Sequence, residues 1–342
     1  MMAPQSTARR APAPREEREI EQGEPLLEIH NLTVEYVTAR GPVRAVDDVT
    51  LALKKGEVLG LCGESGCGKS TLAYAITRLL KPPAQIAGGQ ILFAGHDVTA
   101  MDEDELRKFR WNRISIVFQS AMNSLNPVIS IGAQIADTLM AHTDMSKAEA
   151  LERGADLLRI VGIERARLKS YPHELSGGMR QRAVIAIALA LSPELIIMDE
   201  PTTALDVVVQ KEILQQIEDL KERFGFSILF ITHDLSLLIE MSTRIAVMYA
   251  GKIAELSTAD ELFRNPEHPY TVGLMNSFPS ITGPRRELTG IPGTPPHLLN
   301  PPSGCRFHPR CPHVMAVCAD VEPALAEAPP GHPVACHLYP GF

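Results

Sequence analysis

The 342-residue sequence predicts an α/β fold built on a mostly parallel sheet. Short apolar runs alternate with helical patterns along most of the chain, which is typical of a parallel sheet covered on both faces. A glycine-rich segment at residues 63–70 follows one of these runs and opens a helix. Two regions depart from this pattern. In the N-terminal region apolar and polar residues alternate, as in an antiparallel sheet, and the C-terminal region is rich in Pro and Cys. We therefore expect a P-loop domain with an antiparallel β subdomain, an inserted helical subdomain and a C-terminal extension.

The N-terminal region divides into two parts. Residues 1–24 mix Ala, Pro, Arg and Glu with almost no apolar side chains, so burial cannot offset the entropy of ordering them. We expect a disordered tail there. From Leu26 onward apolar residues alternate with polar ones, as they do again at Val49, Leu51 and Leu53. This period of two predicts strands of an antiparallel sheet.

The remaining elements follow in order. Between about residues 120 and 191 the strand signal stops and helical periodicity takes over, which predicts an inserted helical subdomain. We expect the main domain to span 25–265 and a separate, loop-rich extension to span 266–342. The apolar runs predicted as parallel strands are 91–93, 114–118, 195–198, 228–231 and 245–248.

Composition narrows the classes of function. The net charge of −8 argues against a nucleic-acid-binding protein, because such proteins usually present a positively charged surface to the phosphates. The longest wholly apolar run has nine residues, 183–191, whereas a membrane-spanning helix needs roughly 20. The N-terminus lacks the apolar core of a signal peptide. We expect a cytosolic chain that can dock on a membrane protein.

The glycine-rich segment matches the pattern G-x-x-x-x-G-K-[ST] of a phosphate-binding P-loop. An apolar strand precedes it and an apolar-periodic helix follows it, which is the context this loop requires. Backbone N–H groups of such a loop, together with the helix N-terminus, bind a polyphosphate. The candidate nucleotide-binding residues here are Gly63, Glu64, Ser65, Gly66, Cys67, Gly68, Lys69, Ser70 and Thr71.

An acidic pair ends a second apolar run. Asp199 and Glu200 directly follow residues 195–198, so they lie at the carboxyl edge of the predicted sheet, where open α/β sheets bind ligands. We predict that Asp199 holds Mg²⁺ together with Ser70. Glu200 is the candidate general base for hydrolysis, since a base must lie within hydrogen-bond reach of the attacking water.

A third segment, LSGGMRQR at 175–182, begins a helix. Ser176 is a candidate N-cap, and Gly177 and Gly178 allow close backbone approach to an anion. The order of the segments in the chain resembles that of ABC-type ATPases. The resemblance runs through Tyr36, the P-loop, Gln119, LSGGMRQR, LIIMDE, the residues Thr203-Ala204-Leu205-Asp206, and His233.

This resemblance implies roles for single residues. Tyr36 is similar to the aromatic on which adenine stacks, and Gln119 to a residue that links the metal site to the helical subdomain. His233 resembles the switch histidine that contacts the γ-phosphate, and Asp206 an aspartate that faces a partner subunit. In the family, the segment that corresponds to LSGGMRQR is called the signature segment, and that of one subunit closes over nucleotide held by another. The resemblance thus implies that Ser176, Gly177 and Gly178 act in trans, in a two-subunit ATP sandwich.

The C-terminal motifs narrow the resemblance. Residues 268–271, 291–296 and 304–312 resemble the extension of dipeptide and oligopeptide permease ATP-binding subunits, and the likeness spans about 26–340. The segment LSGGMRQR has Met179 where many relatives have Gln, and in this it resembles the first of two non-identical ATPase subunits of such systems. The resemblance implies a heterodimer that powers peptide import with two transmembrane permease subunits and an extracytoplasmic solute-binding protein, peripheral on the cytoplasmic face of the inner membrane. Nickel or glutathione import stays open, as does a soluble ABC ATPase that acts on ribosomes or DNA.

Four of the six cysteines lie in this extension: Cys305, Cys311, Cys318 and Cys336. Their spacing lacks the C-x₂₋₄-C pairs of structural zinc sites and differs from the ferredoxin pattern. Members of the permease subfamily bind a [4Fe–4S] cluster with four such cysteines, so the resemblance implies this cluster. Zinc and reduced structural thiols remain alternatives.

Overall fold

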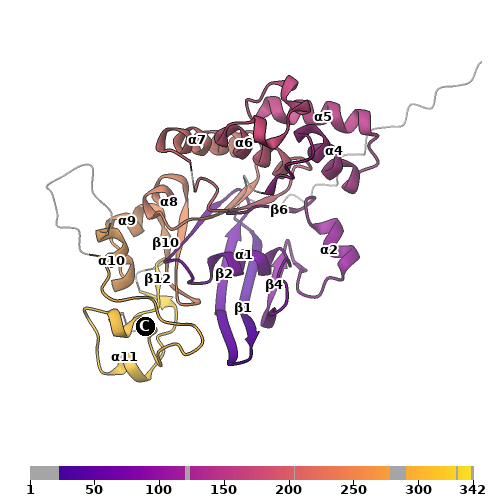
Figure 1. Ribbon diagram of the computed structural model, residues 1–342. Coiled ribbons are helices and arrows are strands. Elements are labelled where there is room, and N and C mark those ends of the chain that lie inside the picture. Colours follow the sequence, from indigo (N-terminus) through magenta and orange to yellow (C-terminus); the bar gives the residue numbers. More distant parts are fainter. Residues whose placement is uncertain (1–22, 120–123, 204, 278–289, 329, 340–342) are drawn as a thin grey trace, which may run out of the picture.

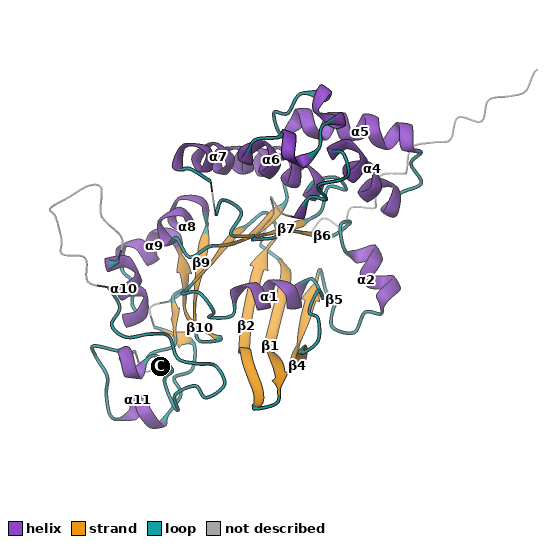
Figure 2. Ribbon diagram, viewed as in Figure 1, coloured by secondary structure: helices purple, strands orange, loops and turns teal. Residues whose placement is uncertain are grey.

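Two sheets and the helices around them make up the computed structural model (Figures 1 and 2). The structure describes residues 23–119, 124–203, 205–277, 290–328 and 330–339. The predicted disordered tail lies outside the described residues, apart from Gly23 and Glu24.

The N-terminal sheet is antiparallel, in the order β2-β1-β4-β5. Its inward-facing side chains, such as Leu27, Ile29 and Leu53, are buried in one apolar cluster. Residues 91–93 belong to this sheet, because Ile91 pairs with Ile29 in antiparallel register. The prediction that 91–93 form a parallel strand was therefore wrong: only alternate residues of that run, Ile91 and Phe93, are fully buried, as in a one-faced sheet. The strands are β1 (Pro25–Thr38), β2 (Gly41–Lys54), β4 (Ala84–Phe93) and β5 (His96–Asp97).

The central sheet has the strand order β11-β12-β10-β9-β3-β8-β7-β6, and its strands from β9 to β6 are parallel. Neighbouring residues of each parallel strand are buried on opposite faces, which explains the continuous apolar runs in the sequence. The predicted α/β class is confirmed. The bounds are β3 (Val58–Cys62), β6 (Ile114–Val117), β7 (Leu195–Asp199), β8 (Ser227–Ile231), β9 (Arg244–Tyr249), β10 (Lys252–Thr258), β11 (Ala326–Glu327) and β12 (Pro333–Val334).

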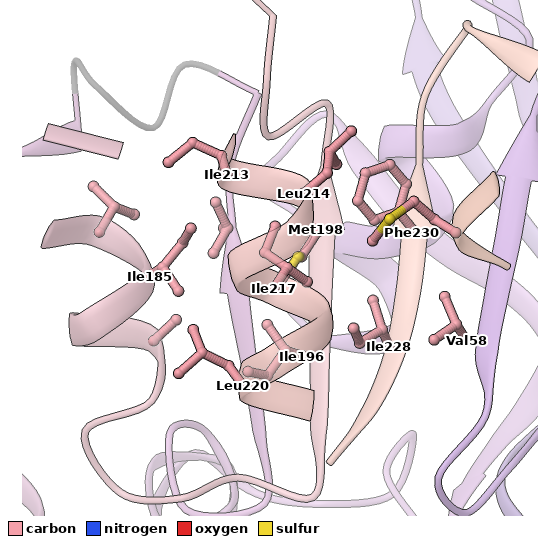
Figure 3. Packing of buried hydrophobic residues seen from close by; sticks show 14 of the residues in the cluster. Val58, Ile185, Ile196, Met198, Ile213, Leu214, Ile217, Leu220, Ile228 and Phe230 are labelled. Carbon is pink, nitrogen blue, oxygen red and sulfur yellow. The ribbon is translucent and has the colours of Figure 1, made fainter. Parts of the chain in front are cut away.

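Each face of the central sheet packs against a different layer. On one face Ile196, Met198 and Phe230 contact the apolar side of α7 (Figure 3). On the other face Leu195 and Ile197 join the cluster formed by α1 and the antiparallel sheet. The helices are α1 (Lys69–Ile76), α2 (Glu103–Phe109), α4 (Ile131–His142), α5 (Lys147–Ile160), α6 (Gly177–Ala188), α7 (Val207–Phe224), α8 (Leu235–Met241), α9 (Ala259–Arg264), α10 (Pro269–Asn276) and α11 (Val317–Asp320).

Three helices, α4 to α6, lie between β6 and β7 in the chain and group together in space (Figure 1). Ser130, Ser146 and Ser176 cap their N-termini, because each hydroxyl accepts a hydrogen bond from the backbone N–H three residues on. This is where helical periodicity replaced the strand signal. The boundaries 120 and 191 stay predictions, and residues 120–123 lie outside the described part.

The C-terminal extension is attached to the central sheet. β12 pairs with β10 through Val334 and Glu255, so the end of the chain extends the sheet at the edge opposite β6. Tyr270 and Phe307 are buried against the core, with ring centroids 5.5 Å apart. These aromatic side chains bury their area against the main domain, so this part of the predicted extension packs on the core.

Candidate nucleotide site

The loop between β3 and α1 depends on glycine. Gly63, Gly66 and Gly68 have φ values of 149°, 79° and 114°, which side chains rarely adopt. A Cβ at Gly63 would lie 2.1 Å from the carbonyl oxygen of Met248, and one at Gly68 2.1 Å from that of Ala45. Backbone from two neighbouring segments therefore encloses the loop, and the G-x-x-x-x-G pattern is a packing requirement here.

Lys69 folds back over this loop. Its Nζ donates to the carbonyl oxygen of Gly63 at 2.7 Å and to that of Glu64 at 3.1 Å, and the residue is 6 % exposed. The ammonium thus lies at the centre of the loop. Cys67 is buried beside it, and burial raises the pKa of the Cys67 thiol, which favours the neutral form.

Asp199 ends β7 with a buried carboxylate that is 1 % exposed. Burial raises its pKa, while the neighbouring Ser70 hydroxyl and Lys69 ammonium lower it. Within the described chain neither carboxylate oxygen has a hydrogen-bond partner. A buried carboxylate without partners is costly unless a cation compensates it, so Asp199 and Ser70 fit the predicted Mg²⁺ site.

Glu200 lies at the centre of a hydrogen-bond network. Its Oε2 accepts from Gln119 Nε2 at 2.7 Å and from the Thr203 hydroxyl at 3.1 Å, and its Oε1 lies 3.1 Å from His233 Nδ1. Partial burial raises the pKa of Glu200, but the hydrogen bonds from His233 and Gln119 outweigh it, so the pKa lies below its ordinary value. The carboxylate is ionised at neutral pH and can accept a proton from a water molecule.

The signature segment lies on the opposite face of the central sheet from α1. Ser176, Gly177 and Gly178 start α6, which packs in the helical layer, whereas the P-loop helix packs against the antiparallel sheet (Figure 1). Ser176 is exposed and caps α6 through Met179 N. Asp206 is also exposed and caps α7 by accepting from the N–H groups of Val208 and Val209. One chain therefore does not bring its signature segment and its P-loop together.

Comparison with known proteins decides the family. Residues 46–203 match the ABC transporter family, and residues 254–318 match the C-terminal region of oligopeptide and dipeptide transporters. The probable peptide ABC transporter ATP-binding protein y4tR of Sinorhizobium fredii is 48% identical over 315 residues, which are 91% of this chain and 94% of that protein. The chain belongs to the ABC transporter family.

Other relatives agree. The oligopeptide transport ATP-binding protein OppD of Escherichia coli is 45% identical and covers 92% of this ABC ATPase, with 94% of its own length matched. Among solved structures, a dimeric post-hydrolysis state of the ATP-binding cassette MJ0796 with ADP and Pi aligns with a TM-score of 0.62 at 30% identity. The alignment covers 68% of this chain and 98% of the MJ0796 chain. The chain is an ATPase of this family.

The site of this ABC ATPase combines predicted and unpredicted residues. The structure gathers the P-loop, Asp199, Glu200, Gln119 and His233 from distant parts of the sequence. Tyr36 lies beside them, with its hydroxyl 3.2 Å from that of Thr71, and its stacking on adenine stays a prediction. Thr203 has no role predicted from the sequence, although its place three residues after Glu200 was a usable signal. Tyr270 and Arg310, which contact Glu64 from far along the chain, likewise have none.

The four cysteines of the extension form no disulfide in the described part of the chain. Burial, together with the nearby thiols of Cys318, Cys336 and Cys311, raises the pKa of Cys305 to about 11. The four residues are thus neighbours, and Cys305 N donates to Cys318 O at 2.8 Å. No group of three or more His, Cys, Asp or Glu residues in the described ranges lies in position to hold a metal ion.

The helices of this ABC ATPase are too short or too polar to span a membrane, among the residues that the structure describes. The nine-residue apolar run 183–191 falls largely in α6, a buried helix of the helical layer.

Proposed function

We propose that this chain is an ATP-hydrolysing subunit of a membrane complex that imports dipeptides or oligopeptides. The observation that carries the proposal is the full-length likeness to peptide transport ATP-binding proteins, together with the match of 254–318 to the C-terminal region of such transporters. The proposal includes a division into an ATPase domain at 25–265, with a helical subdomain near 120–191, and an extension at 266–342.

The site residues divide the work of hydrolysis. Lys69 and the backbone N–H groups of the loop hold the β- and γ-phosphates. Asp199 and Ser70 hold Mg²⁺, with Gln119 beside them, and the cation would supply charge neutralisation between the phosphates. Tyr36 stacks on adenine.

Glu200 takes the proton of the attacking water. His233 and Gln119 keep its carboxylate ionised and fix its orientation, because they occupy one oxygen each. In the ATP state His233 contacts the γ-phosphate. Developing charge on the transferred phosphoryl group is met by Lys69 and by backbone N–H groups.

A second subunit completes the site. Ser176, Gly177 and Gly178 face away from the P-loop of their own chain, so they bind the nucleotide held by a partner, and Asp206 faces that partner. Support comes from the MJ0796 structure, which is described as dimeric. We propose a heterodimer with a second ABC ATPase, docked on two permease subunits at the cytoplasmic face of the inner membrane and served by an extracytoplasmic solute-binding protein.

We also propose that Cys305, Cys311, Cys318 and Cys336 bind a [4Fe–4S] cluster. Their mutual proximity supports it. Such a cluster takes one thiolate at each of four iron atoms, so its ligands stand further apart than those of a single ion. An iron and sulfide assay on anaerobically purified protein tests the proposal; stoichiometric zinc or metal-free thiols would contradict it.

The transport function is tested by the ATPase rate of the membrane-embedded complex. The rate should rise when the solute-binding protein is loaded with a dipeptide or oligopeptide. Stimulation by nickel or glutathione alone would contradict peptide import. A chain that sediments with ribosomes, and not with membranes that contain co-expressed permease subunits, would contradict transport altogether.

A further inference from the structure

Glu64, the second residue of the P-loop, is held by two residues from the C-terminal part of the chain. Its carboxylate forms a two-point ion pair with Arg310, at 2.6 Å from Oε2 to Nη1 and 3.0 Å from Oε1 to Nη2. Its backbone N–H donates to the Tyr270 hydroxyl at 2.8 Å. Both partners lie in the region that matches oligopeptide and dipeptide transporters, outside the matched ABC core.

Arg310 is itself fixed in place. It is 7 % exposed, its Nε donates to the carbonyl oxygen of Pro292 at 2.8 Å, and its Nη1 donates to the Tyr249 hydroxyl at 3.3 Å. The guanidinium also lies over the rings of Tyr249 and Phe307. Because the planar guanidinium of Arg310 is fixed by these contacts, it orients the Glu64 carboxylate more strictly than a mobile surface cation would.

These contacts change the role expected of Glu64. Its N–H points to Tyr270 and is therefore engaged away from a phosphate, and its carbonyl oxygen accepts from Lys69. Glu64 is held in place through its N–H, its carbonyl oxygen and its carboxylate. Glu64 is thus an anchor by which the extension fixes the loop, and the N–H groups that bind phosphate come from the residues after it.

The ion pair also matters for charge. A lone carboxylate on the loop would repel the polyphosphate that the loop binds, and the repulsion between close charges in a partly buried site is poorly screened. Arg310 neutralises this carboxylate from the side of the extension. Its removal would both free the loop and restore the repulsion.

We propose that Arg310 and Tyr270 are positioning residues for ATP binding, so that the extension forms part of the nucleotide site's support. The proposal rests on the proposed P-loop function. The competing interpretation is that Arg310 only fastens the extension to the core. Arg306 offers a matched control for that role, because it is a half-buried arginine of the same extension whose hydrogen bonds go to Asp47 and to the carbonyl oxygen of Ala250, and it has no recorded hydrogen bond or ion pair with a P-loop residue.

The experiment measures ATP affinity, the KM and kcat for hydrolysis, and the melting temperature without nucleotide, in the assembled complex. Arg310→Met should weaken ATP binding about tenfold and raise KM with a smaller change in kcat, whereas Arg306→Met should lower only the melting temperature. Tyr270→Phe, which keeps the ring packing, should weaken ATP binding by a smaller factor.

Charge compensation has its own readout. If Arg310 cancels the charge of Glu64, adding Glu64→Gln to Arg310→Met should recover part of the lost affinity, and Arg310→Lys should lose less than Arg310→Met. Equal melting losses in Arg310→Met and Arg306→Met with unchanged ATP affinity would overturn the proposal. Lys69→Ala separates a failure of this inference from a failure of the proposed ATP site. If Lys69→Ala loses ATP binding and Arg310→Met does not, only the inference about Arg310 fails. If Lys69→Ala keeps ATP binding, the proposed ATP site fails as well.

Discussion

Glu200 shows at the scale of one residue how environment sets chemical role. Asp199 and Glu200 are adjacent acids, yet the Asp199 oxygens have no hydrogen-bond partner among the described residues, whereas those of Glu200 have three. The first arrangement suits a cation, and the second suits a fixed, ionised base. The function proposed above accordingly gives the two neighbouring carboxylates different roles, a cation ligand and a general base.

Replacing Glu200 by Gln should lower the hydrolysis rate by about 10²–10⁴-fold, because the amide cannot take a proton from water. ATP binding should persist, and the dimer should stay closed. Phosphate release and nucleotide retention on the same sample check this. Glu212→Gln, which alters an exposed ion pair with Arg182, serves as the control, and unimpaired hydrolysis in Glu200→Gln would contradict the assignment of the base.

Replacing Asp199 by Asn should have opposite effects on stability and activity. The neutral amide removes a buried charge whose oxygens have no hydrogen-bond partner among the described residues, so the free energy of unfolding of the nucleotide-free protein should rise by about 1–3 kcal/mol. Magnesium-dependent stabilisation by ATP should disappear, because the cation loses its carboxylate ligand. Thermal unfolding with ATP, with and without Mg²⁺, measures both, and retained Mg²⁺ stabilisation would contradict the metal site.

At the scale of elements, the P-loop depends on how its neighbours enclose it. The carbonyl oxygen of Ala45 from β2 leaves no room for a side chain at Gly68, whereas the space around Gly225, the C-cap of α7, is open. Both glycines have positive φ values. The two positions therefore separate backbone strain from steric clash.

Gly68→Ala should abolish ATP binding and cost several kcal/mol of stability, since backbone must move to admit the new methyl group. Gly225→Ala should cost about 1 kcal/mol, which is the conformational penalty alone, and leave ATP binding unchanged. Denaturant unfolding and an ATP-binding assay on both variants check this. Equal losses in the two variants would show that the Ala45 contact is unimportant.

The start of α10 makes a second prediction at this scale. His268 is 3 % exposed, and burial lowers its pKa to about 4 even though Glu255 opposes the shift; His332 pairs with the same Glu255. Between pH 6.5 and 4 the unfolded chain binds a proton at His268 that the folded chain does not. Its contribution to stability should therefore fall by about 1.4 kcal/mol per pH unit as the pH drops through that window.

His268→Asn tests this effect. His268 Nδ1 accepts from Tyr270 N at the start of α10, and the Asn side-chain oxygen can replace that acceptor without titrating. The pH dependence of unfolding between pH 4 and 6.5 should become shallower in the variant. An unchanged slope would show that His268 does not titrate there.

At the scale of the whole molecule, local patterns predicted more than distant contacts did. The P-loop, the strand that ends at Asp199 and the helical character of the chain between β6 and β7 have their signals in consecutive residues, so the sequence predicted them. Residues 91–93 were misplaced because a short apolar run has the same appearance in a parallel and an antiparallel strand. The contacts from Arg310 and Tyr270 to Glu64 join residues more than 200 positions apart, and no local period encodes such a contact.

The central proposal is that this chain hydrolyses ATP to drive peptide import, and labelled-peptide uptake by proteoliposomes that contain the assembled complex tests it most directly. With the native chain, uptake should require ATP and should proceed together with hydrolysis. With Lys69→Ala, which removes the ammonium at the centre of the P-loop, uptake should fall to background while the complex remains assembled. ATP-dependent peptide uptake that persists in the Lys69→Ala complex would contradict the account.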